Sequence, residues 1–94
     1  MCKKLFERGQ LVFTMFVNDA VADSVEMSKG VIDSLSRHFN GDWGEVPVED
    51  KEANDQALGD GTRLFSAYSI GDRKIWIITE ADRSATTVLF PEEY

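Results

Sequence analysis

The chain has 94 residues and a formal net charge of −7, and 43% of its residues are hydrophobic and 11% aromatic. These numbers predict one small domain and exclude a disordered chain. They argue against direct binding to nucleic acid or to an anionic membrane surface, because phosphate recognition needs clustered Lys and Arg, whereas the ten basic residues are scattered. No apolar run approaches the roughly 20 residues of a membrane span.

Residues 1–10 are mostly polar, and they are interpreted as a leader that precedes a domain over residues 11–94. Residues 11–17 are rich in aromatic and β-branched side chains, which predicts a strand. Cys2 is the only cysteine, so no internal disulfide can form. A single thiol is typical of a reducing compartment, and we expect a cytoplasmic protein.

A first helix is predicted over residues 23–39. Asp23 and Glu26 have the spacing of a capping box, and Gly30 suggests close packing against the sheet. Asn40 and Gly41 tolerate the left-handed conformation that closes a helix. The expected buried face consists of apolar side chains at helical spacing: Val25, Ile32, Leu35 and Phe39.

A second helix is predicted over residues 48–58, because Pro47 suits a helix start and Gly59 and Gly61 suit its end. This region concentrates negative charge. Residues 42–60 contain seven Asp and Glu against Lys51 alone, which gives −6 of the total −7. Acidic residues near a helix start are favoured by the helix dipole.

The last third of the chain alternates like a sheet. Strands are predicted over residues 64–70, 74–79 and 86–90, and Gly71-Asp72 suits a two-residue type II′ hairpin turn. The order of elements predicts an α+β fold, in which two helices cover one face of a mainly antiparallel sheet of about four strands.

Several motifs together resemble one small bacterial family. They are RHFNGDWG at 37–44, EDKEANDQAL at 49–58, LFSAY at 64–68, KIWIITEADRSATTVL at 74–89 and PEEY at 91–94. The family is carried on plasmids and other mobile elements, and its members are labelled "plasmid-related protein" or, in some cases, a type I restriction subunit. The resemblance implies a mobile genetic setting and no particular activity.

One hypothesis is a small hydrolase. His38 is the only histidine, and it lies at the end of the first predicted helix, where the dipole favours imidazolium. If Asp42, Glu80 and Asp82 met His38 at one end of the sheet, the group could hold a metal or perform acid–base catalysis. Alternatively, Asp42 caps its own turn and His38 bonds to the backbone. We assign no catalytic residue, metal or cofactor.

We favour a non-enzymatic protein that docks a protein partner with a basic surface through the acidic helix and the Trp43 loop. Long-range attraction from such a patch would speed association. The simpler alternative is a solvated helix, and a third is a structural homodimer joined through an exposed strand edge. The expected binding residues are Trp43, Glu45, Glu49, Asp50, Glu52 and Asp55.

Overall fold

The computed structural model describes residues 5–94, so the prediction for Cys2 lies outside the described residues. Within that range the chain forms an α+β domain, as expected. The elements in chain order are β1 (Gln10–Phe13), α1 (Met15–Asp23), α2 (Val25–Phe39), α3 (Val48–Asp60), β2 (Leu64–Ile70), β3 (Arg73–Thr79), β4 (Ala85–Leu89) and the short 3-10 helix η1 (Pro91–Glu93).

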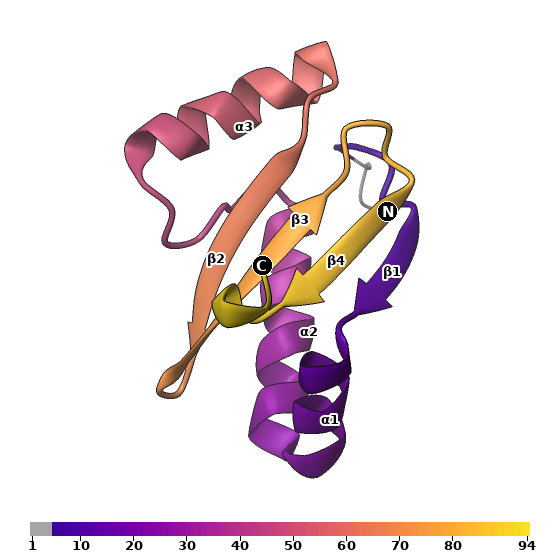
Figure 1. Cartoon of the computed structure of the whole chain (residues 1–94). Helices are drawn as coiled ribbons and strands as arrows, with labels where there is room; N and C mark the ends of the chain where they lie inside the picture. The colour runs from indigo at the N-terminus through magenta and orange to yellow at the C-terminus, as the bar shows by residue number, and fades with distance from the viewer. Residues whose placement is uncertain (1–4) are drawn as a thin grey trace.

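The sheet is mixed and has the strand order β1-β4-β3-β2 (Figure 1). The pairs β2–β3 and β3–β4 are antiparallel, and β1 pairs with β4 in parallel. Ile70 pairs with Arg73, which confirms the two-residue turn at Gly71-Asp72. Gly71 has a φ of 61°, the conformation that glycine adopts readily at the first central position of a type II′ turn.

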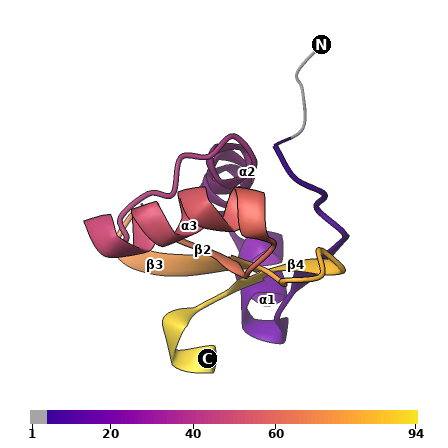
Figure 2. The same cartoon turned by 90° about the horizontal axis from the view of Figure 1, so that it is seen from above.

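The helices α2 and α3 lie on one face of the sheet, and the C-terminal segment lies on the other (Figure 2). Tyr68 and Ile70 of the sheet pack with Val31 and Leu35 of α2 in the main core. Gly30 permits this contact, because a Cβ atom there would lie 2.5 Å from Cγ2 of Ile70. The expected close packing at Gly30 is therefore confirmed.

The prediction of a strand over residues 11–17 is wrong for the second half of that range. β1 ends at Phe13, and Thr14 caps α1 by accepting a hydrogen bond from the amide of Val17 at 3.4 Å. Val17, Ala20 and Val21 follow at helical spacing and pack against the core. Hydrophobic content alone did not distinguish a strand from a strand followed by a helix.

The start and the buried face of α2 also differ from the prediction. Ser24, not Asp23, is the N-cap, and its hydroxyl accepts a hydrogen bond from the amide of Met27 at 3.2 Å. Val25 is 77% exposed and Ile32 is exposed as well. The face that meets the sheet repeats at i, i+4, i+7, i+8 and i+11, and it consists of Met27, Val31, Ser34, Leu35 and His38.

The outer edge of β2 is covered by two segments. Asn54 of α3 is buried, and its side-chain amide bonds to both main-chain groups of Phe65, at 2.6 Å to the carbonyl and 3.1 Å from the N–H. Gly44 forms a parallel bridge with Ala67, where the amide of Glu45 donates to the Ala67 carbonyl at 2.7 Å. Both contacts satisfy backbone groups that an edge strand otherwise leaves open.

Contacts with the domain begin before residue 11, within the stretch expected to be a leader. The ring of Phe6 lies 5.6 Å from the ring of His38, and the guanidinium of Arg8 lies 4.2 Å from the centre of the Phe39 ring. The amide of Gln10 donates to the carbonyl of Ser84 at 2.9 Å. Residues 6–10 therefore cover the end of α2 and one end of the sheet.

Candidate functional site

His38 lies in the interior and is 0% exposed. Its Nδ1 bonds to the Ser66 hydroxyl, and its Nε2 bonds to the Thr79 hydroxyl at 2.9 Å. The Thr79 hydroxyl bonds to that of Thr86 at 2.8 Å, and Thr86 donates to the main-chain carbonyl of Arg8 at 2.7 Å. One continuous chain of side-chain hydrogen bonds therefore links β2, α2, β3 and β4 to residue 8.

The directions of these bonds follow from the last one, because a carbonyl can only accept. Thr86 donates its single hydroxyl proton to that carbonyl, so it must accept a hydrogen bond from the Thr79 hydroxyl. Thr79 in turn accepts from Nε2 of His38. The neutral His38 tautomer thus carries its proton on Nε2, and Nδ1 accepts from Ser66.

Burial lowers the pKa of His38 to about 4. The sequence prediction that the helix dipole would favour imidazolium is therefore wrong, because desolvation outweighs the dipole at this buried position. The ring is neutral near pH 7 and both of its nitrogens are occupied by internal partners. It is not available to a substrate.

The other members of the proposed catalytic group do not join His38. Asp42 pairs with Arg37, with 2.8 Å between Oδ2 and Nε, and this interaction holds the pKa of the Asp42 carboxyl below its usual value. Glu80 and Asp82 are exposed, and Asp82 accepts from the Ser84 amide at 3.0 Å. Within residues 5–94 no cluster of His, Cys, Asp and Glu is placed to hold a metal. The described contacts therefore do not assemble His38, Asp42, Glu80 and Asp82 into one shared site.

Trp43 also differs from the expected docking anchor. Its ring is 3% exposed and packs with Val46, Ala57 and Leu64 in a second core cluster. The indole N–H donates to Oδ1 of Asp55 at 2.9 Å. Trp43 is therefore structural, since it joins the loop before α3 to α3 itself and leaves no ring surface for a partner.

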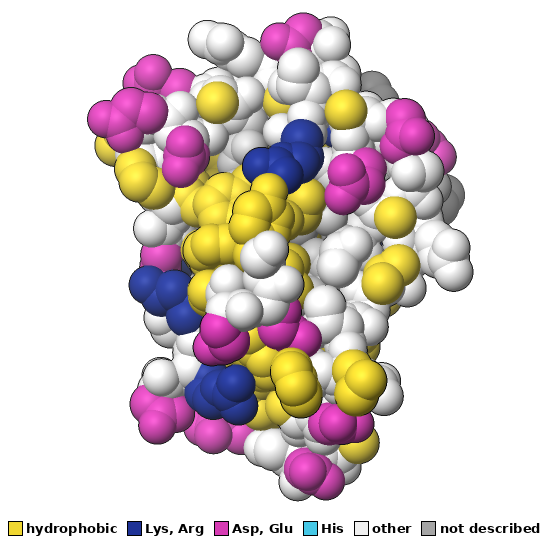
Figure 3. All heavy atoms as spheres, in the orientation of Figure 1, with side chains coloured by type: hydrophobic (Ala, Val, Ile, Leu, Met, Phe, Trp, Pro, Cys, Tyr) yellow, Lys and Arg dark blue, Asp and Glu magenta, His cyan; other side chains and the backbone are white. Residues whose placement is uncertain are grey.

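The remaining predicted binding residues divide into two groups. Glu45 lies 3.6 Å from Nζ of Lys74 and also accepts from the Ser69 hydroxyl, and Asp55 accepts from Trp43. Glu49, Asp50 and Glu52 of α3 are exposed, and in the part of the chain that the structure describes no ion pair reaches them. Acidic side chains (magenta) stand over α3 at the upper left of Figure 3. We call Glu49, Asp50 and Glu52 the acidic face.

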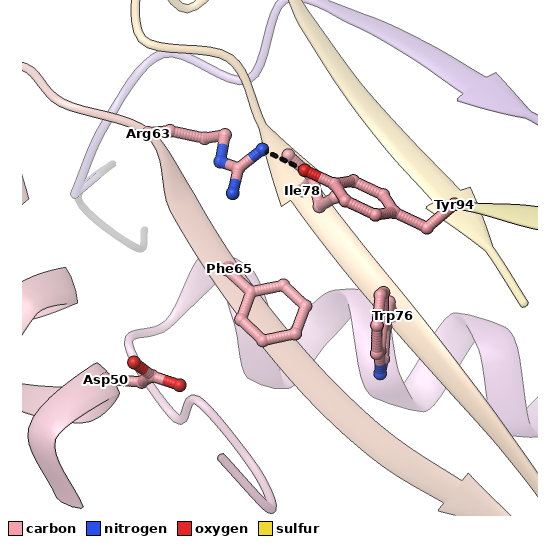
Figure 4. A pocket seen from close by; sticks show the side chains of 6 residues that line it. All are labelled: Asp50, Arg63, Phe65, Trp76, Ile78 and Tyr94. Carbon is pink, nitrogen blue, oxygen red and sulfur yellow. Dashed lines mark hydrogen bonds between the residues drawn. The ribbon is translucent and has the colours of Figure 1, made fainter. Parts of the chain in front are cut away.

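A hollow of about 300 Å³ opens on the sheet face opposite α2, where hydrophobic side chains gather at the middle of Figure 3. The ring of Trp76 packs edge-to-face with the ring of Phe65, with 5.1 Å between the ring centres. The centre of the Tyr94 ring lies 5.6 Å from that of Trp76. Figure 4 shows Asp50 on one side of the Phe65 ring and Trp76 on the other, with Arg63 bonded to the Tyr94 hydroxyl at 2.7 Å. The residues that line the hollow are Asp50, Arg63, Phe65, Trp76, Ile78 and Tyr94.

Sequence reasoning missed this hollow, although one signal was present. Phe65 and Trp76 alternate with the core-facing residues of β2 and β3, so both side chains point to the face that α2 does not cover. The approach of Tyr94 from the C-terminus and of Asp50 from α3 depends on tertiary packing, and the spacing of residues does not encode it.

No family model, no curated protein and no solved structure matches this chain. The resemblance to the plasmid-related family stays a prediction. None of the helices within residues 5–94 combines the length and apolar character that crossing a bilayer requires.

Proposed function

We propose that this chain is a non-enzymatic binding protein of a plasmid or other mobile element that acts in the cytoplasm. It docks a protein partner with a basic surface through α3. The observation that carries the proposal is the acidic face, whose three carboxylates are exposed and have no ion pair within the described residues. The α3 sequence holds five acidic residues and one Lys, so its formal charge is −4.

The position of the acidic face supports this role. Glu49 and Asp50 lie in the first turn of α3, where the positive end of the helix dipole stabilises them in place. They therefore need no basic side chain from the same molecule and stay available to a partner. Such a surface attracts a positively charged protein over about a Debye length of 8–10 Å at physiological salt.

The test is charge reversal on α3 with a matched control. We expect the double variant Glu49→Lys and Glu52→Lys to reduce capture of the partner from host lysate on the order of tenfold. Asp55 is left intact because it holds Trp43. The control is the double variant Asp19→Lys and Asp33→Lys. Both residues are exposed, on α1 and α2, and this variant changes the net charge by the same amount. Equal capture by both variants would reject the acidic face.

The homodimer alternative keeps one supporting feature. β1 is the edge strand opposite β2, and Leu11 is 51% exposed there. The β2 edge is already covered by Asn54 and Gly44. A dimer would therefore form through β1, and its solution mass would be twice the 10.6 kDa of one chain. A mass that stays at one chain across concentrations would reject it.

A further inference from the structure

The hollow on the open sheet face adjoins the acidic face, since Asp50 belongs to both. We propose that the hollow receives an arginine side chain of the basic protein partner, whose guanidinium stacks on the ring of Phe65 beside Trp76 and pairs with Asp50. This proposal rests on the proposed function and adds the residue that the partner inserts.

The floor of the hollow suits a flat cation. Phe65 and Trp76 are half-buried, and their edge-to-face packing at an interplanar angle of 89° holds the two rings in different orientations. In Figure 4 the face of the Phe65 ring is turned toward the viewer. A guanidinium stacks on such a ring by cation–π attraction and, unlike an ammonium, also presents a planar fork to a carboxylate.

The charges around the hollow orient the guest. Asp50 supplies an acceptor on one side, and Arg63 stands on another with one N–H engaged by Tyr94. A cation therefore settles on the Asp50 side. The remaining donors of Arg63 suit a main-chain carbonyl of the same partner segment.

The size of the hollow also favours a side chain. Its volume of about 300 Å³ is at the lower limit of ligand pockets, which run from roughly 300 to 1,000 Å³. That space is suited to one long side chain rather than to a large cofactor. The net charge of −7 brings basic segments to this surface in preference to acidic ones.

The experiment is an NMR titration of the ¹⁵N-labelled full chain with the peptide acetyl-Gly-Arg-Gly-amide. We expect the indole N–H signal of Trp76 to move and saturate with a Kd on the order of millimolar. The Trp43 signal is the internal control and should stay in place, because its N–H is bonded to Asp55 in the interior. The same peptide with Gln in place of Arg should leave both signals unmoved.

Two variants locate the binding. Asp50→Asn and Trp76→Leu should each raise the Kd of the peptide at least about fivefold. The control Glu52→Gln removes the same charge from the same helix outside the hollow, and its Kd should stay within about twofold of that of the original chain. If Trp76→Leu does not fold, Trp76→Phe keeps a ring and should bind within about threefold of the original chain. Both Trp76 variants lack the indole N–H, so their response is read from the backbone amide of Phe65.

Three results would overturn the proposal: an unmoved Trp76 signal, an equal response to the Gln peptide, or equal weakening by Asp50→Asn and Glu52→Gln. Movement caused by acetyl-Gly-Glu-Gly-amide instead would assign the hollow to an anion held by Arg63, and would also overturn it. The outcome is separable from that of the proposed function, because Glu49 and Glu52 do not line the hollow. Loss of partner capture on their reversal, without peptide binding, rejects the hollow alone.

Discussion

Lowering the pH from 7 to 4 is expected to remove about 3 kcal/mol from the free energy of unfolding through His38 alone. Burial lowers the pKa of the folded state to about 4, from the ordinary value of 6.5. Protons therefore bind the unfolded chain first, and the stabilisation is complete above pH 6.5 and is lost as the pH falls toward 4. For a domain of this size that is a large part of the total stability.

The measurement is urea unfolding at half-unit pH steps, together with the NMR signals of the single histidine. The His38 ring signals should show no titration between pH 8 and pH 5.5. The control variant His38→Gln should lose stability at pH 7, because it disturbs the bonds to Ser66 and Thr79, and its stability should then change little between pH 6.5 and pH 4.5. A ring titration centred near pH 6.5 would contradict the expectation.

The second large effect is expected at Gly44, which forms the bridge to Ala67. A Cβ atom at Gly44 would lie 2.0 Å from the Ala67 carbonyl oxygen and 2.7 Å from the Tyr68 ring, and the φ of Gly44 is +74°. Gly44→Ala should therefore destabilise the chain by about 3 kcal/mol or more, because the backbone must move away from β2.

Gly61 supplies a matched control. Its φ is +79°, almost that of Gly44, but a Cβ atom there would meet nothing within 4 Å. Gly61→Ala should cost only about 1 kcal/mol from the left-handed backbone, so the difference between the two variants isolates the close approach to Ala67. Urea unfolding of both variants gives the comparison, and equal losses would show that the steric contact is unimportant.

Some features of the candidate site could be predicted from local sequence signals, and others depend on tertiary packing. The concentration of carboxylates in α3 could be read directly, because charge is a property of the residues themselves. The availability of the carboxylates in α3 and in the loop before it could not be predicted, because Lys74 reaches Glu45 and Trp43 reaches Asp55 only after β3 and that loop are in place. Trp43 shows most clearly that burial could not be predicted from the sequence, since nearby glycines are compatible with an exposed loop and with a buried one.

His38 shows a different limit. Its place at the end of a helix was evident, but the sign of its pKa shift depends on burial, and burial is a property of the assembled core. The partners that replaced solvent, Ser66 and Thr79, come from two different strands. No spacing along the chain relates them.

The sequence by itself determined the α+β class, the hairpin at Gly71-Asp72, the closure of α2 at Asn40 and Gly41, and the accumulation of negative charge on α3. The first three features follow from backbone preferences and from alternation within a few residues, which act locally, and the charge is a property of the residues themselves. The tertiary structure decided the division of residues 11–17 between β1 and α1, the face that α2 buries, the neutral His38 and the aromatic hollow. Each of these depends on which distant atoms exclude water from a group, and chain neighbours do not specify that.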